Sequence, residues 1–165
     1  MVTRKESMWN IIKEDMLFSG LTVVDFGSGN NELAIFAVEA GARVIAIDNN
    51  PKYNDETLKT IKRLVLLVAD IDDMILPDGD VAFCFSVLPY LRHPIELLQG
   101  LSTKYRRTYI ECQYDGDGPG PHFLKTDDDM AIWLGMWWDS CTPIGKTFVP
   151  GRDKHRTIWR CKGES

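Results

Sequence analysis

The chain has 165 residues, a length typical of one domain, and a formal net charge of −5. Its 44% hydrophobic and 26% charged residues are ordinary for a globular protein, which argues against a disordered or fibrous chain. The negative charge disfavours a dedicated binder of duplex DNA, and no apolar run reaches the roughly 18 residues of a membrane span. We therefore expect one globular domain over residues 1–165.

The cysteine pattern gives no sign of a metal site. Because the four cysteines lie far apart and form no C-x-x-C pair, neither a zinc site nor a redox motif is predicted. Cys84, Cys112 and Cys161 fall within apolar strand patterns and are expected to be small core residues with free thiols. Free thiols favour a location in the reducing cytoplasm. The N-terminus lacks the apolar segment of a signal peptide. The cysteines are Cys84, Cys112, Cys141 and Cys161.

Residues 1–20 predict an N-terminal helix. Thr3 and Glu6 have the spacing of a capping box, in which each side chain accepts a hydrogen bond from the other residue's backbone. Apolar residues then recur at helical spacing from Met8 to Met16, and Gly20 ends the pattern. We expect this helix to pack on a sheet.

Residues 21–48 say most about function. They predict a strand over 21–26, a loop containing Gly27 and Gly29, a helix over 31–40 that is apolar nearly all round, and a strand over 42–47 followed by Asp48. This βαβ pattern is typical of proteins that bind a cofactor containing a nucleoside. The glycines let the backbone approach the ligand, and a carboxylate at the second strand end can accept hydrogen bonds from both ribose hydroxyls.

Two acids indicate which cofactor this pattern favours. Glu32 stands where a dinucleotide fold has its third glycine, and its charge would repel a pyrophosphate. Asp25 places another carboxylate at the end of the first strand, which suits a ligand that carries an ammonium and a sulfonium group. The residues therefore favour S-adenosylmethionine over NAD.

The sequence VVDFGSGN at residues 23–30 resembles the first motif of the class I S-adenosylmethionine-dependent methyltransferases. Ile47-Asp48 resembles the ribose-binding acid of that family, and later segments follow the family's order over most of the chain. The resemblance implies a methyltransferase with S-adenosylmethionine as cofactor. One departure is Asn31, where many relatives have glycine or another small residue. The cofactor contacts implied here are Asp25, Gly27, Ser28, Gly29, Asn30, Asp48 and Asn49.

The remaining segments continue the alternation of strands and helices. Strands are predicted at 64–69, 81–85 and 108–112, the first as an apolar run covered on both faces. Helices are predicted at about 55–61, from Pro94 to about 103, and after Thr126, and a closing hairpin at 141–149 and 156–161. The expected fold is α/β, a single Rossmann-like methyltransferase domain. It has a seven-stranded, mostly parallel sheet, a C-terminal antiparallel hairpin and helices on both faces.

Asp70 ends the third predicted strand, at the sheet edge where open α/β folds bind ligands. In the family, an acid here binds the adenine amino group and the next backbone amide meets a ring nitrogen, which implies cofactor contacts for Asp70 and Ile71. Asp72, Asp73 and Asp78 lie close by, so Asp70 is alternatively a solvated acid at a strand end.

The fourth strand is followed by Ser86 and Pro89-Tyr90, where the family presents its acceptor-facing motif. Enzymes that methylate amino groups of nucleic acids have Asn/Asp-Pro-Pro-Tyr there, and only Pro-Tyr is kept. The resemblance places Ser86 beside the cofactor, while Tyr90 either faces the acceptor or packs under the next helix. His93 is either a general base or a helix cap, and the cap is favoured.

A loop rich in glycine and proline follows the fifth strand at 115–121. Because acceptors bind at loops of this sheet edge, Tyr114, Asp115, Asp117 and His122 are candidates for the acceptor pocket. With Tyr90, Asp117 and His122 are the candidate catalytic residues. The alternative is a mobile connector. A tryptophan-rich stripe at helical spacing over 130–138 could stack on a nucleobase, but its regular period favours a core helix.

Three functions remain open at this point. The favoured one is methyl transfer to a small-molecule or nucleotide-like acceptor, with no membrane partner. The second is a nucleic-acid methyltransferase that uses Pro89-Tyr90 and basic residues at 152–156. The third is a module that binds the cofactor without transferring the methyl group. The short chain leaves little room for a lid, so we expect an open acceptor pocket or one completed by a partner subunit in a homo-oligomer.

Overall fold

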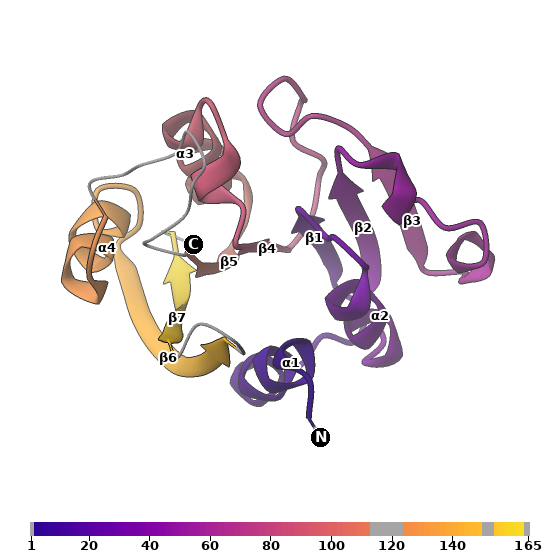
Figure 1. Cartoon of the computed structure of the whole chain (residues 1–165), viewed down its shortest axis with the longest axis horizontal. Coiled ribbons are helices and arrows are strands. Elements are labelled where there is room, and N and C mark those ends of the chain that lie inside the picture. Colours follow the sequence, from indigo (N-terminus) through magenta and orange to yellow (C-terminus); the bar gives the residue numbers. More distant parts are fainter. Residues whose placement is uncertain (1, 113–123, 150–153, 164–165) are drawn as a thin grey trace.

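Five parallel strands form most of one sheet: β1 (Thr22–Phe26), β2 (Arg43–Asp48), β3 (Leu64–Val68), β4 (Val81–Phe85) and β5 (Arg107–Glu111). The hairpin of β6 (Ser140–Val149) and β7 (Lys154–Lys162) continues the sheet, with β7 antiparallel to β5. In this computed structural model, which describes residues 2–112, 124–149 and 154–163, the strand order is β3-β2-β1-β4-β5-β7-β6 (Figure 1).

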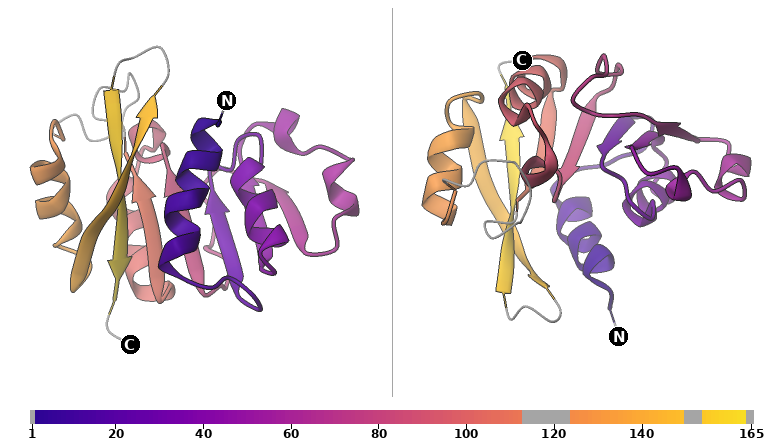
Figure 2. Two further views of the ribbon diagram at one scale, coloured as in Figure 1. Left: turned by 90° about the horizontal axis from the view of Figure 1, so that it is seen from below. Right: turned by 45° about the horizontal axis from the view of Figure 1, so that its top comes forward.

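Helices cover both faces of the sheet (Figures 1 and 2). One face packs against α1 (Arg4–Asp15) and α2 (Glu32–Glu39), and the other against α3 (Pro94–Lys104) and α4 (Asp127–Leu134). Single turns of 3-10 helix lie at η1 (Pro51–Tyr53), η2 (Leu58–Thr60) and η3 (Leu88–Tyr90). The predicted fold class, with seven strands and a C-terminal antiparallel hairpin, is confirmed.

Capping boxes fix the starts of two helices. The Thr3 hydroxyl accepts the Glu6 backbone N–H at 3.1 Å and the Glu6 carboxylate accepts the Thr3 N–H, as predicted. Thr126 and Asp129 make the same exchange at α4. The helix predicted to run through the tryptophan stripe is shorter than expected, because α4 ends at Leu134. Trp138 nevertheless packs in the core, as its spacing suggested.

Two expectations about the β2–β3 region are wrong. The helix predicted over 55–61 consists only of the 3-10 turn η2 and irregular chain. β3 is not covered on both faces, since Val65, Leu67 and Val68 are 52%, 39% and 47% exposed. The physical reason is that β3 is an edge strand and that the chain from 69 to 80 forms no helix over it.

The sheet order reverses at β1, which lies between β2 and β4. In open α/β sheets, such a reversal leaves a crevice at the carboxyl ends of the strands, where ligands bind. The loops after these strands carry the residues singled out in the sequence. Within the described residues, no helix is long and apolar enough to cross a membrane.

Candidate cofactor and acceptor site

The loop after β1 depends on glycine in two ways. Gly27 has φ 71°, and a Cβ there would lie 2.2 Å from the Cγ2 atom of Val87, so only glycine lets this loop pack against the turn after β4. Gly29 has φ 55°, and no heavy atom lies within 4 Å of the position a Cβ would take. Its backbone therefore faces open space at the mouth of the crevice.

The conformation of Asn31 shows why asparagine can stand where many relatives have glycine. It has φ 62°, a left-handed conformation that asparagine tolerates better than most other residues with a side chain. Its side-chain amide is buried and donates a hydrogen bond to the carbonyl oxygen of Tyr53 at 2.8 Å. Asn31 thus provides the backbone conformation of a glycine and also ties the loop to η1.

Asp48 is held in place by backbone N–H groups on both of its oxygens. One oxygen accepts from Gly29 at 3.0 Å, and the other accepts from Asn50 at 2.9 Å. Because an ionised carboxylate has about four acceptor positions, it keeps capacity for two further donors. Asp48 lines the crevice, so this remaining acceptor capacity lies beside the pocket.

Asp25 lies in β1, next to the glycine loop in sequence, and is 2% exposed. Its Oδ2 atom has no hydrogen-bond partner among the residues that the structure describes. Burial raises the pKa of Asp25 to about 6, with Lys5 opposing the rise and the charge of Asp48 adding to it. A buried carboxylate that lacks a donor is a fitting partner for a cationic ligand group such as an ammonium.

These loops enclose a pocket of about 430 Å³. This volume is within the range of about 300–1,000 Å³ that is usual for small-molecule and cofactor sites. Seven of the ten cofactor residues expected from the sequence line it: Gly27, Gly29, Asp48, Asn49, Asp70, Ile71 and Ser86. No cluster of three or more potential metal ligands occurs within residues 2–112, 124–149 and 154–163.

Most of the other predicted site residues do not line this pocket. Ser28 is buried, with its backbone N–H on the Ile47 carbonyl, and the Asn30 side chain donates to Glu32 at the surface. Neither residue lines the pocket, and neither does Asp25. Tyr90 does line it and is 58% exposed. The acceptor candidates Tyr114, Asp115, Asp117 and His122 lie outside the described residues.

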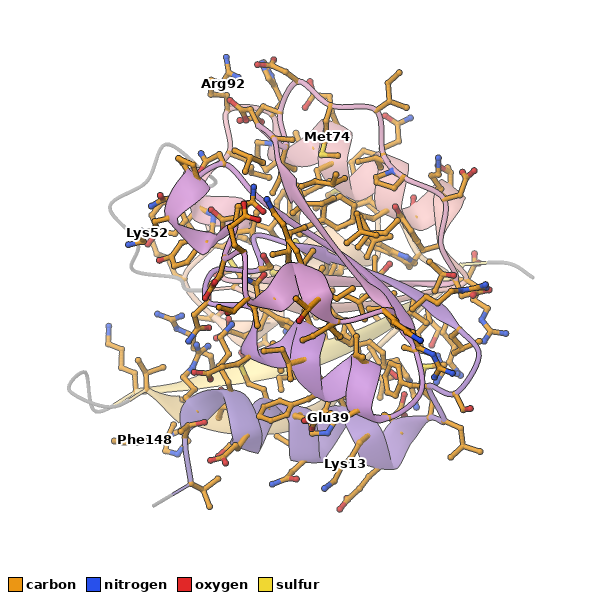
Figure 3. The ribbon with its side chains drawn as sticks, turned by 90° about the vertical axis from the view of Figure 1, so that its right-hand side faces the viewer. Lys13, Glu39, Lys52, Met74, Arg92 and Phe148 are labelled. Carbon is orange, nitrogen blue, oxygen red and sulfur yellow. The ribbon has the colours of Figure 1, made fainter. Side chains whose placement is uncertain are left out.

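At the rim of the pocket, Arg92 links the segment that follows β4 to the segment that follows β3. Its guanidinium lies 3.2 Å from Asp70, 2.9 Å from Asp73 and 3.4 Å from Asp72. The second Asp70 oxygen accepts the Asp72 backbone N–H at 3.1 Å. Asp70 is therefore a fixed acceptor at the rim, and Figure 3 shows Arg92 on the same side of the molecule as Lys52 of η1.

Asp72 fixes the two residues that precede α3. It accepts the backbone N–H groups of Arg92 and His93 at 2.9 and 2.8 Å. Burial alone would raise the pKa of Asp72, but these donors and the Arg92 guanidinium outweigh it and lower the pKa. His93 occupies the N-cap position of α3, as expected, but its side chain makes no capping hydrogen bond.

A buried network behind the pocket was missed in the sequence. Glu111, at the end of β5, is fully buried and accepts the Ser86 hydroxyl at 2.7 Å. Its other oxygen forms ion pairs with Arg156, at 3.5 Å, and with Arg4 of α1. The only sequence signal was a single acid at the end of an apolar strand, beside the ligand-binding edge.

This network holds Ser86 in an unusual backbone conformation. Ser86 has φ 59°, and its N–H donates to the Glu111 carbonyl at 2.8 Å. Its hydroxyl donates its proton to Glu111 and accepts from Arg156 at 3.0 Å, so it is not placed as a proton acceptor for a substrate. Because the next residue, Val87, packs on Gly27, Glu111 positions both the end of β4 and the glycine loop.

Several solved structures with a similar fold are named as methyltransferases. The magnesium protoporphyrin IX methyltransferase of Synechocystis PCC 6803, with bound S-adenosylhomocysteine, has a TM-score of 0.76 and 19% identity, covering 97% of this chain and 82% of that one. The 1,6-didemethyltoxoflavin-N1-methyltransferase of Burkholderia thailandensis, also with S-adenosylhomocysteine, has a TM-score of 0.77 and 17% identity, with coverages of 99% and 80%.

A candidate RNA methyltransferase of Pyrococcus horikoshii has a TM-score of 0.66 and 15% identity, with coverages of 97% and 83%. At these identities, the likeness concerns the fold. No curated protein sequence matches the chain.

The sequence itself matches the family model described as a methyltransferase domain, over residues 24–106. This match spans half of the chain and includes the glycine loop, Asp48, Asp70 and the end of β4. The chain therefore belongs to the methyltransferase-domain family, and the expected class of enzyme, the S-adenosylmethionine-dependent methyltransferases, is confirmed.

Proposed function

We propose that the pocket binds S-adenosylmethionine and that the chain transfers its methyl group to a small-molecule or nucleotide-like acceptor. The observation that carries the proposal is the 430 Å³ pocket at the point where the sheet order reverses. Gly29, Asp48 and Ser86, which follow or end three different strands, meet there. This is the position at which open α/β sheets bind ligands.

The polar groups of the cofactor would find partners among the pocket residues and Asp25. Asp48 would accept the two ribose hydroxyls, and Asp70 the adenine amino group, with the Ile71 amide near the ring. The unpaired oxygen of Asp25 would hold the ammonium group, which supplies the donor that this oxygen lacks. Gly29 leaves space for the chain of the cofactor to pass close to the backbone.

The bound cofactor supplies a methyl group that its sulfonium already activates. The protein's task is then to align the acceptor nucleophile and to exclude water, which can contribute up to about 7–11 kcal/mol. Ser86 and Tyr90 lie on the β4 side of the pocket, and the half-exposed ring of Tyr90 can contact an acceptor there. A proton acceptor would add about 10²–10⁴-fold, and Asp117 and His122 are the candidates.

A small acceptor is favoured over a nucleic acid by the charges around the pocket. Asp70 and Asp72 line the pocket, and together with Asp73 they share the guanidinium of Arg92. Three carboxylates against one guanidinium disfavour the approach of a phosphate backbone. Two of the structural neighbours act on small molecules by name, which supports the same choice. The Pyrococcus neighbour keeps an RNA acceptor as the alternative.

Two experiments test the proposal. Calorimetric titration should show binding of S-adenosylhomocysteine and no comparable binding of NAD, and tighter binding of NAD would overturn the cofactor assignment. Incubation with methyl-labelled cofactor and separate metabolite and RNA extracts should then label the metabolite fraction. Label in RNA would favour the alternative acceptor. Cofactor binding without label in any acceptor pool would indicate a binding module without transfer activity.

A further inference from the structure

The two edges of the sheet differ in how they are protected. At one edge, β6 contains Pro143, a register irregularity between Pro143 and Gly145, and Lys146, which pairs with Asp127 at 2.8 Å. Proline, bulges and charged side chains are the usual features that prevent an edge strand from pairing with another chain. The β6 edge is therefore built to remain unpaired.

The opposite edge, β3, has none of these features. Its five residues, Leu64–Val68, are all apolar, and its register with β2 is continuous. Val65, Leu67 and Val68 are 52%, 39% and 47% exposed, so no segment of the described chain covers them. Figure 3 views the molecule from the side on which β3 forms the edge. An apolar edge strand of this kind is a template for strand pairing.

The hydrogen-bond pattern shows which backbone groups are available. The Arg63 carbonyl accepts from Val44 in β2, and the Ala69 N–H donates to the Asp48 carbonyl. Since backbone groups alternate in direction along a strand, residues 63, 65, 67 and 69 face β2. The N–H and C=O groups of Leu66 and Val68 therefore point away from β2, toward the open edge.

The ends of β3 carry opposite charges. Lys62 and Arg63 precede the strand and are exposed. The segment after it carries three carboxylates, which the single guanidinium of Arg92 balances only in part. When two copies of a strand pair antiparallel, the start of one lies beside the end of the other. The basic end of each β3 would then lie beside the acidic end of the other, which favours this arrangement over a parallel one.

We propose that β3 pairs antiparallel with β3 of a second copy of the chain, about a twofold axis at Leu66. Leu66, the middle residue of the strand, then faces its own copy in a hydrogen-bonded pair. Val65 lies opposite Leu67 of the partner subunit, so the side chains exposed in one copy cover each other. Lys62 comes close to the acidic segment of the partner, and the two sheets become one. This inference does not depend on the proposed function.

Sedimentation velocity over a range of about 1 µM to 1 mM tests the dimer, because a short strand interface should be of moderate affinity. The wild-type chain should change from monomer to dimer over this range. Val65→Lys adds the kind of charge that protects natural edge strands, and it should raise the dimer dissociation constant by at least about tenfold. Because Val65 is half-exposed in a single copy, its circular dichroism spectrum and melting temperature should stay close to those of the wild type.

The matched control is Ile132→Lys, which changes an apolar residue of α4 that is 68% exposed and distant from β3. It should leave the dissociation constant unchanged. A wild-type chain that stays monomeric over the whole range would overturn the proposal. So would a dimer that Val65→Lys and Ile132→Lys affect equally, because its interface would then lie elsewhere.

A charge exchange tests the antiparallel direction. Lys62→Asp and Asp73→Lys should each weaken the dimer, because each places like charges beside each other across the interface. The double variant restores opposite charges at the two ends and should dimerise more tightly than either single variant. If the loss of dimerisation free energy in the double variant equals the sum of the losses in the two single variants, the oppositely charged ends do not meet. The antiparallel arrangement would then be wrong.

Discussion

The carboxyl group of Asp25 has a pKa of about 6 in the folded chain, against 3.8 for an ordinary aspartate, chiefly because it is buried. Between about pH 4 and pH 6, the folded chain therefore holds a proton that the unfolded chain has lost. The folded state binds more protons in this window, so the free energy of unfolding falls as pH rises and then levels off.

Asp25→Asn should remove this decrease. We expect the variant to be more stable than the wild type above pH 6, by roughly 1–3 kcal/mol, and to differ less at pH 4. Urea unfolding at pH 4, 5 and 7.5 measures the difference. The same variant should bind S-adenosylhomocysteine more weakly, because it loses the charge that pairs with the ammonium. A parallel fall in stability with pH in both proteins would show that Asp25 does not titrate in this way.

Asp48→Ala should weaken binding of S-adenosylhomocysteine by about 1–3 kcal/mol, because two ribose hydroxyls and the Gly29 N–H lose their acceptor. Calorimetric titration measures the affinity, and circular dichroism checks the fold. Asp55→Ala is the matched control, since that carboxylate is exposed and accepts hydrogen bonds from the nearby Thr57. Equal affinities for the two variants would remove Asp48 from the cofactor site.

At the scale of elements, Glu111 joins β5 to α1, to β7 and to the turn after β4. Glu111→Ala should lower the free energy of unfolding by about 3–5 kcal/mol, because it removes the buried carboxylate that pairs with the guanidinium groups of Arg4 and Arg156. Urea denaturation measures this loss.

The comparison for Glu111→Ala is Glu56→Ala, which removes an exposed ion pair with Lys59 and should cost about 1 kcal/mol or less. If both variants lose the same small amount, the Glu111 network does not hold these elements together.

The elements that sequence could predict are those fixed by local patterns. The segment from β1 to β2 follows from glycines, an apolar helix and two acids within one stretch of chain, and Asp48 and Gly29 meet as the pattern indicates. The Glu111 network could not be predicted, because Ser86 and Arg4 lie 25 and 107 positions away from Glu111. A solitary acid in an apolar strand does not reveal which cations will surround it.

The expectation that β3 is covered on both faces was wrong for a similar reason, because local sequence does not show what packs on a strand. A continuous apolar run indicates a strand, and β3 is one, but whether a helix covers it depends on the connections at either end. The segment after β3 makes the rim of the pocket through Asp70 and Asp72 instead of forming a helix. The exposed side chains of β3 are therefore a consequence of how this small chain builds its site.

For the whole molecule, the distribution of charge bears on the choice between the proposed acceptor classes. The formal net charge is −5. Several arginines that could bind phosphates are instead held in internal ion pairs: Arg107 and Arg160 with Asp15, and Arg4 with Glu111. A nucleic-acid methyltransferase needs a free basic surface to bind the phosphate backbone. The described residues use these arginines to fasten α1 and the hairpin to the sheet.

We therefore expect the chain to pass through a column of immobilised RNA without retention at about 100 mM salt, and to do the same on duplex DNA. A basic RNA-binding protein of similar size, run on the same column, shows that the matrix is active. Retention that decreases steeply as salt rises would mean that several phosphates are neutralised on binding. In that case the basic residues at 152–156 would have to supply the contacts, and the acceptor would be a nucleic acid.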